Sequence, residues 1–246
     1  MDFWIKGISS ILEENKKTGW IVYKLFNGFS RLMKNLSCHV GVLSEGKMPH
    51  PLHQHAEEEV MVILCGELEC TTAQDRLPYG KKQDRLKRGS VIYLSAYHQH
   101  TIRSIGPGPA EFLIIRWKGT INKLNADIPK SFVFNQSERD QLPISKFGSE
   151  LSMVRLFEMP TKYLRNLCAS IQDLKIDAGV KPHRSDHDLA IILMDGRIDT
   201  MHSEISAPAV LFFPAGIPHW TKNVGQIATS SFVFEFHGDK GVSLQR

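Results

Sequence analysis

Short apolar runs separated by turn residues dominate the pattern of this 246-residue chain. Each run is rich in β-branched or aromatic residues and is flanked by Gly, Pro or Asp, which is typical of β-strands. The clearest runs are residues 60–64, 90–94, 111–117, 189–194, 210–213 and 231–236. The pattern favours an all-β fold built as a sandwich or barrel.

Helical periodicity is confined to the start of the chain. Trp4, Ile5, Ile8, Ile11 and Leu12 recur at the spacing of one helix face. This pattern predicts a short amphipathic helix over residues 3–16. We therefore interpret residues 1–24 as an N-terminal extension that is helical.

The chain also contains one long internal repeat. Residues 31–37 (Arg-Leu-Met-Lys-Asn-Leu-Ser) are similar to residues 162–168 (Lys-Tyr-Leu-Arg-Asn-Leu-Cys), and each copy continues into a His-bearing segment, an apolar strand and an aromatic-rich strand. A repeat of this length indicates two copies of one domain. The predicted division is residues 25–118 for the first domain, 119–149 for a linker and 150–246 for the second domain. Within the linker, residues 132–134 are expected to add one strand to an adjoining sheet.

Composition and charge restrict the classes of partner. Hydrophobic residues make up 42% of the chain, charged residues 23%, and the formal net charge is +4, as in an ordinary soluble protein. The basic cluster at residues 81–88 lacks interleaved aromatic residues, so we expect no nucleic acid as partner. No apolar run approaches the roughly 20 residues that span a bilayer, so we expect no membrane as partner. The four cysteines form no Cys-x-x-Cys pair, so a reducing cytoplasm is the expected location. We expect a monomer or a homodimer.

Three polar residues stand at alternate positions before and within the first apolar strand. His53 and His55 are two residues apart, and Glu59 follows four residues later. Because residues of equal parity share one face of an extended strand, all three are expected to point into one barrel interior. Met61, Ile63 and Cys65 continue this parity and are expected to line the interior below them. We interpret Glu57 and Glu58 as solvated charges.

His100, from a neighbouring strand, completes a set of three imidazoles and one carboxylate. Such a mixed nitrogen and oxygen set suits divalent Fe, Mn, Ni, Co, Cu or Zn, whereas calcium and magnesium prefer oxygen ligands. The alternative is that the segment from Met48 to His55 is a His-rich surface loop. The common parity, the apolar strand that follows and the distant second histidine favour the metal site.

These residues resemble the two sequence motifs of the cupin family. The first motif, Gly, spacer, His-x-His, Glu and Gly, corresponds here to Gly46, His53-Gln-His55, Glu59 and Gly66. The second motif retains Gly89 and His100, with Ser95, Tyr97 and Ser104 in place of its Pro, Gly and Asn. The resemblance covers roughly residues 25–118 and 150–237. It implies a bicupin, two jelly-roll β-barrels in tandem, with the metal inside the barrel near one open end.

The second copy departs from the motifs in the opposite way. Its second motif is nearly complete, from Pro214 to Asn223. In its first motif, alignment of Gly196 with Gly66 places His183, Ser185 and Leu189 on the three ligand positions. Candidate ligands for a second site are then His183, His187 and His219, with Asp186 or Asp188 as a source of oxygen. We favour one working metal site, in the first barrel, and a scaffold role for the second.

Cupins host many chemistries, so the fold alone does not determine the function. The resemblance favours a metal-dependent enzyme, of dioxygenase type, that acts on a small polar molecule. The alternatives are a non-redox isomerase, decarboxylase or hydrolase, and a non-catalytic module for ligand binding or storage. Candidate catalytic or substrate-binding residues near the barrel opening are His50, Tyr97, His98 and Arg116. If its strand face points inward, Arg116 is expected to hold a carboxylate or phosphate; an outward position on an edge strand is the alternative.

Overall fold

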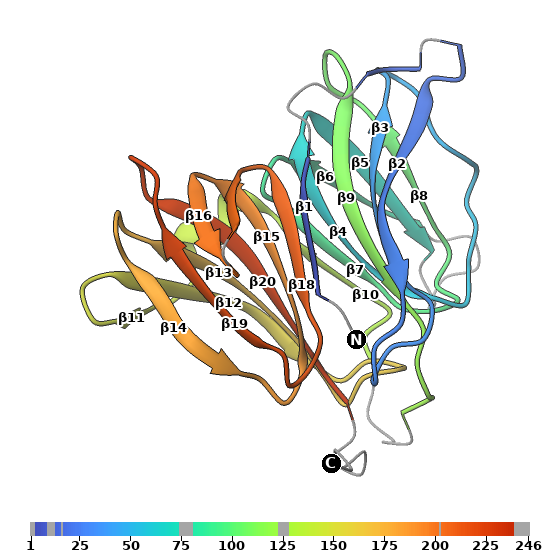
Figure 1. Ribbon diagram of the computed structural model, residues 1–246. Coiled ribbons are helices and arrows are strands. Elements are labelled where there is room, and N and C mark those ends of the chain that lie inside the picture. The colour runs from blue at the N-terminus through green and yellow to red at the C-terminus, as the bar shows by residue number, and fades with distance from the viewer. Residues whose placement is uncertain are drawn as a thin grey trace.

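The computed structural model describes residues 3–8, 13–15, 17–73, 81–122, 128–201 and 203–238. These residues form two β-barrels packed side by side, one from each copy of the repeat (Figure 1). The predicted all-β fold is confirmed. Within the described ranges the only helical element is a short 3-10 helix, Gln136–Gln141, and no helix has the length and apolar content that a membrane crossing needs.

Barrel 1 consists of a six-stranded and a three-stranded antiparallel sheet. The larger sheet has the strand order β10-β7-β4-β9-β3-β2, and the smaller has the order β6-β5-β8. Their bounds are β2 Trp20–Gly28, β3 Leu36–Leu43, β4 Glu58–Cys65, β5 Glu67–Ala73, β6 Lys81–Lys87, β7 Val91–Leu94, β8 His100–Ser104, β9 Ala110–Trp117 and β10 Ser131–Phe134.

Barrel 2 repeats this arrangement with a seven-stranded sheet, in the order β1-β18-β15-β20-β13-β12-β11, and a four-stranded sheet, in the order β14-β19-β16-β17. Their bounds are β1 Trp4–Gly7, β11 Ile144–Phe147, β12 Leu151–Met159, β13 Asn166–Leu174, β14 Gly179–Arg184, β15 Asp188–Asp195, β16 Arg197–Thr200, β17 Ser203–Ser206, β18 Ala209–Phe213, β19 Pro218–Asn223 and β20 Thr229–His237.

The two large sheets pack against each other through one continuous apolar core. In β4, Val60 and Val62 face this shared core, whereas Met61 and Ile63 face the interior of barrel 1. In β15, the even-numbered residues likewise face the shared core and the odd-numbered ones the interior of barrel 2. Both faces of these strands are buried, which explains why they read as continuous apolar runs.

Each barrel receives a strand from the segment that precedes the other barrel. β10, from the segment before barrel 2, pairs with β7 of barrel 1. β1, the dark blue strand in Figure 1, pairs with β18 of barrel 2. The predicted helix over residues 3–16 is therefore wrong where the structure describes it, because Trp4–Gly7 form a strand; residues 9–12 and 16 lie outside the described residues. Pairing with β18 and packing of Trp4 on Phe26, with ring centroids 4.9 Å apart, override the local helical pattern.

Glu58 joins the two barrels from a fully buried position. Its carboxylate accepts hydrogen bonds from Tyr93 (2.8 Å) and Trp117 (3.0 Å) of barrel 1. It also accepts them from the Thr161 hydroxyl and the Lys162 backbone amide, both at 2.7 Å, on the segment that enters barrel 2. The interpretation of Glu58 as a solvated charge is wrong, because the face of β4 that it occupies is covered by the second barrel.

Candidate metal centre

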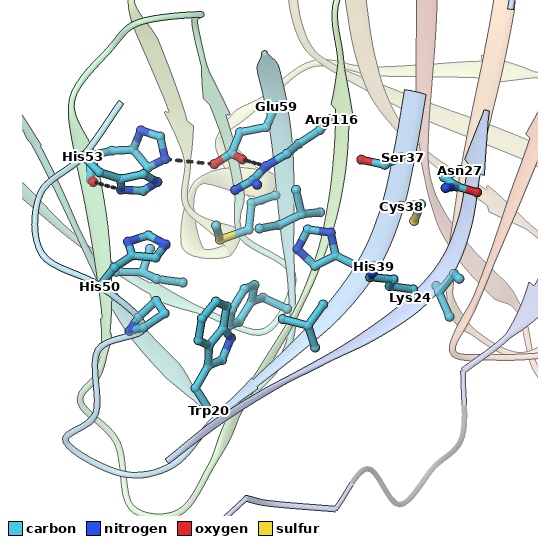
Figure 2. Close-up of a pocket in the computed structure, with 18 of the residues that line it drawn as sticks. Trp20, Lys24, Asn27, Ser37, Cys38, His39, His50, His53, Glu59 and Arg116 are labelled. Carbon is cyan, nitrogen blue, oxygen red and sulfur yellow. Dashed lines mark hydrogen bonds and ion pairs between the residues drawn. The ribbon is translucent and has the colours of Figure 1, made fainter. Parts of the chain in front are cut away.

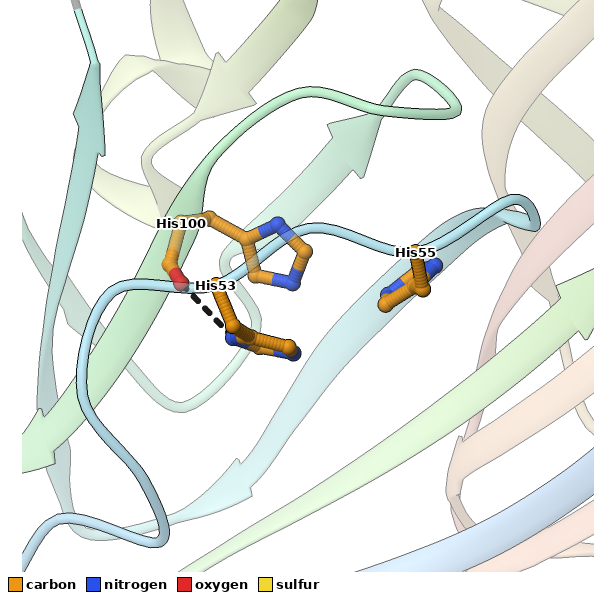
Figure 3. A group of neighbouring side chains, drawn as sticks. All are labelled: His53, His55 and His100. Carbon is orange, nitrogen blue, oxygen red and sulfur yellow. Dashed lines mark hydrogen bonds between the residues drawn. The ribbon is translucent and has the colours of Figure 1, made fainter.

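Three histidines converge inside one end of barrel 1. The backbones of His53 and His100 exchange hydrogen bonds of 3.1 and 2.8 Å across an isolated bridge, which places the two rings side by side. His55 lies two residues further along the same loop. One ring nitrogen from each of the three residues lies within 4.8 Å of the others, and the rings turn toward one another (Figure 3).

Backbone carbonyls orient all three rings in the same way. The Nδ1 atom of His53 lies 2.9 Å from the His100 carbonyl, that of His55 2.9 Å from the Glu57 carbonyl, and that of His100 2.8 Å from the His98 carbonyl. A carbonyl only accepts, so each Nδ1 carries a proton, and in the neutral ring the lone pair is on Nε2. This is the arrangement of metal-binding imidazoles.

The fourth polar group is Glu59, which is almost completely buried on β4. One carboxylate oxygen lies 3.3 Å from Nε2 of His100, and the other lies 3.4 Å from Nε2 of His55 and 2.6 Å from Nε of Arg116. Burial raises the pKa of Glu59, but the neighbouring imidazoles of His100 and His55 and the Arg116 charge outweigh it and hold that pKa well below its ordinary value. Glu59 is therefore an anion at neutral pH.

The buried polar atoms at this point lack partners of their own. Nε2 of His55 and Oε1 of Glu59 are buried without a hydrogen bond, which carries a free-energy cost unless another group satisfies them. Burial, followed by the charges of His100 and His50, lowers the pKa of His53 to about 4. Neutral imidazoles beside an ionised carboxylate are the donor set of a divalent transition metal, so the residues present fit such an ion.

A cavity of about 550 Å³ adjoins these residues within barrel 1 (Figure 2). Trp20, Met61, Phe112 and Ile114 supply apolar walls, among other side chains. Its polar lining residues are Lys24, His39, His50, His53, Glu59, His100, Thr101 and Arg116, together with Asn27 and Ser37 at one end. Glu59 and Arg116 lie side by side in the lining, and His50 lies beside His53 with ring centroids 3.7 Å apart.

The sequence matches no protein-family model and no curated protein. Its fold, however, is similar to solved structures. A putative glyoxylate-induced protein from Pseudomonas aeruginosa shares 14% identity at a TM-score of 0.70, over 92% of this chain and 84% of that one. The oxalate decarboxylase of Lactobacillus farciminis, in a formate complex, shares 13% identity at a TM-score of 0.69, over 96% and 86%. A mutant of Bacillus subtilis oxalate decarboxylase shares 13% identity at a TM-score of 0.67, over 96% of this chain and 78% of that one.

The chain has a bicupin fold. At identities of 13–14% the likeness concerns the fold, and the donor set of barrel 1 comes from this chain's own residues. In barrel 1, His53, His55, His100 and Glu59 lie together, as the sequence predicted for their positions. Of the residues proposed near the barrel opening, His50 and Arg116 line the cavity, so the side chain of Arg116 points inward.

Three other expectations for barrel 1 differ from the structure: Tyr97 and His98 were expected near the barrel opening, and Cys65 was expected to line the interior. Tyr97 is 51% exposed and lies under the ammonium group of Lys162, 4.3 Å from the ring centroid. His98 is buried but is not among the cavity-lining residues; its carbonyl orients His100. Cys65 is exposed at the end of β4, because an irregularity between Ile63 and Cys65 in the pairing with β9 breaks the alternation.

Barrel 2 separates the three residues predicted as a second site. His183 and His219 pair across β14 and β19, with ring centroids 4.3 Å apart, and a backbone carbonyl orients the Nδ1 of each. His187 lies instead beside His237, at 4.2 Å between centroids. Among the described residues, no group of metal-binding side chains within 4.8 Å of one another contains His183, His187 and His219 together.

Sequence reasoning missed Trp20, Lys24 and His39. Trp20 and Lys24 lie on β2, whose start falls within the predicted N-terminal extension, because no strand was expected before residue 25. His39 lies on β3 in a segment without a cupin motif. A signal was present, since Trp20, Val22 and Lys24 alternate with Ile21 and Tyr23, and the three residues of even number line the cavity.

Proposed function

We propose that barrel 1 is the active site of a metal-dependent enzyme, of dioxygenase type, that acts on a small organic anion with an apolar body. The observation that carries this proposal is that three converging imidazoles and a carboxylate adjoin a cavity of about 550 Å³, with His53, His100 and Glu59 in its lining. A site with a purely structural metal has no need of an adjoining cavity, whereas a catalytic metal keeps a position open to a ligand. When bound there, a redox-active divalent metal supplies a coordination position for substrate or O₂.

Two cations in the lining favour an anionic substrate. Arg116 already holds Glu59 through Nε, and its terminal nitrogens remain able to bind a carboxylate in the bidentate geometry that guanidinium groups favour. Lys24 adds a second positive charge at the same cavity. These groups are expected to orient the anionic end of the substrate beside the three imidazoles.

The apolar walls favour a substrate with a hydrophobic body. Trp20, Met61, Phe112 and Ile114 surround a volume that far exceeds a two-carbon dicarboxylate. Apolar walls exclude water from the reacting atoms and strengthen the electrostatic contacts around them. His50 and His39 also line the cavity, and burial lowers the pKa of both, so that each is a neutral imidazole at neutral pH and can accept a hydrogen bond from a polar group of the substrate.

Decarboxylation is the second candidate reaction. The inward-facing Arg116 suits a substrate carboxylate, and two of the structures with the same fold are oxalate decarboxylases by name. The two reactions differ in their use of O₂: a dioxygenase consumes it in stoichiometric amount, and a decarboxylase releases CO₂ without net consumption.

The test is a substrate screen on tag-free protein loaded separately with Fe(II) and Mn(II). Aromatic and aliphatic carboxylates, with oxalate included, are incubated while O₂ uptake and CO₂ release are followed together. We expect O₂ uptake with a carboxylate that has an apolar body, and at least a hundredfold loss of rate in His55→Ala.

The matched control is His183→Ala, which removes a similarly oriented imidazole from barrel 2 and is expected to keep the full rate. CO₂ release without O₂ uptake would replace the dioxygenase by the decarboxylase. Equal rates in His55→Ala and the unmodified chain would contradict an active site in barrel 1.

A further inference from the structure

A second set of metal-binding side chains lies in barrel 2 around His187 and His237, and it contains neither His183 nor His219. Cys168 lies on β13, Glu235 and His237 lie on β20, and His187 immediately precedes β15. The three strands are neighbours in the order β15-β20-β13. None of these residues stands at a cupin motif position in the sequence, although His187 was a candidate ligand for the predicted second site.

The strand register places the four side chains on one face of the sheet. Cys168 is opposite Glu235 in the pairing of β13 with β20, and Leu189 is opposite Glu235 in the pairing of β15 with β20. His237 is two residues after Glu235, and His187 is two residues before Leu189. Since side chains alternate along a strand, all four point to the face that forms the barrel interior, where Leu189 packs.

The distances between the ligand atoms are close to those of a coordination shell. The ligand atoms of Cys168, Glu235 and His237 all lie within 4.8 Å of one another. Nε2 of His237 lies 3.0 Å and Nε2 of His187 3.9 Å from the same oxygen of Glu235. Tetrahedral zinc with its usual bond lengths needs ligand atoms about 3.3–3.8 Å apart. Cys168, Glu235 and His237 are close to this spacing, and His187, which forms a second such group with Asp186 and His237, adjoins them.

Two further residues form hydrogen bonds to the proposed ligands. Asp186 lies 3.0 Å from Nδ1 of His187, which directs the other ring nitrogen toward Glu235, as the carboxylate partners of metal-bound histidines do. The amide nitrogen of Asn166 donates a hydrogen bond of 3.4 Å to the sulfur of Cys168, an interaction that stabilises a thiolate. Cys168 is only 3% exposed, and both Glu235 and His187 line the cavity of barrel 2.

The chemistry of this group differs from that of the matching positions in barrel 1. The equivalent register positions of barrel 1 are Ser37, which lies opposite Arg116 in the pairing of β3 with β9, and Arg116 itself. The second barrel therefore has a thiol and a carboxylate where the first has a hydroxyl and a fixed cation.

We propose that Cys168, His187, Glu235 and His237 bind a divalent ion of the zinc class. A thiolate, two imidazoles and a carboxylate are ligands typical of zinc, and the sulfur separates this site chemically from the all-nitrogen-and-oxygen set of barrel 1. The site is independent of the reaction proposed for barrel 1. It assigns to the second barrel a metal site displaced from the position of the cupin motifs.

Cobalt(II) tests the proposal because a cobalt–thiolate bond gives an intense charge-transfer band in the near ultraviolet, which nitrogen and oxygen ligands do not give. Metal-free, tag-free protein is titrated with Co²⁺ in thiol-free buffer. The expected result is such a band at stoichiometric cobalt, its loss on addition of Zn²⁺, and its absence in Cys168→Ser.

Three variants make the result specific. Cys65→Ser removes the exposed thiol and His55→Ala removes a barrel-1 imidazole; both are expected to keep the band. His237→Gln, at a partly exposed position, is expected to weaken cobalt binding more than tenfold, and it decides the case if Cys168→Ser does not fold. No band in the unmodified chain, an unchanged band in folded Cys168→Ser, or unchanged affinity in His237→Gln would overturn the proposal.

Discussion

Nε of Arg116 lies 2.6 Å from the carboxylate of Glu59, so the anion beside the three imidazoles is bonded to a cation of the chain itself. The contact has two consequences. It fixes the orientation of Glu59 toward His55 and His100, and it places a positive charge close to where a metal cation would bind. Arg116 thus favours an anionic substrate at some cost to metal affinity.

Replacement of Arg116 is expected to separate these two effects. Arg116→Gln removes the positive charge near the metal centre, so metal affinity should rise by roughly threefold to tenfold. The same change removes a cation that binds the substrate carboxylate, so KM should rise as well. Competitive titration with a metal-sensitive dye measures the first effect. Arg103→Gln, at an exposed position on β8, is the control and should change neither. A fall of metal affinity in Arg116→Gln would contradict the charge argument.

Removal of Glu58 is expected to destabilise the whole molecule. Glu58→Ala leaves buried donors of Tyr93, Trp117 and Thr161 without an acceptor and should lower the free energy of unfolding by about 3–5 kcal/mol. Urea unfolding followed by tryptophan fluorescence measures the loss. Glu150→Ala, at an exposed position, should stay within about 0.5 kcal/mol of the unmodified chain. A similar small change in Glu58→Ala would show that the interbarrel hydrogen bonds contribute little.

His39 is expected to titrate far below an ordinary histidine. Burial and the charge of Arg116 lower its pKa from 6.5 to about 4. As the pH falls, the unfolded chain takes up this proton first, so the contribution of His39 to stability is complete above pH 6.5 and is lost progressively toward pH 4. The midpoint is read from the histidine NMR signals, assigned with His39→Gln. This variant should also lose less stability between pH 7 and pH 5. A midpoint near 6.5 would contradict the burial of the ring.

The sequence predicted the barrel-1 residues well because their signal is local. His53, His55 and Glu59 lie on one short segment with a fixed parity, and Met61 and Ile63 do face the barrel interior. The parity argument failed at Cys65, where the pairing of β4 with β9 is irregular. Alternation along a strand holds only as far as the strand is regular.

Other features depend on contacts between distant segments. Trp4 pairs with Phe212 across β1 and β18, so the helical spacing at the N-terminus was overruled by a barrel more than two hundred residues away in sequence. Glu58 is buried because the second barrel covers it. Glu235 and His237 belong to no sequence motif, and only the register of β20 with β13 and β15 places them beside Cys168 and His187. Such placements follow from topology and packing rather than from any local pattern.

Metal content tests the central claim, that His53, His55, His100 and Glu59 hold a metal, most directly. Tag-free protein is purified and its bound metals are measured by mass spectrometry for the unmodified chain, His55→Ala, Glu59→Ala and the barrel-2 control His183→Ala. We expect His55→Ala and Glu59→Ala to contain about one equivalent of metal per chain less than the unmodified protein, because loss of a ligand weakens binding strongly, and His183→Ala to match it. Equal metal content in all four proteins would contradict the assignment.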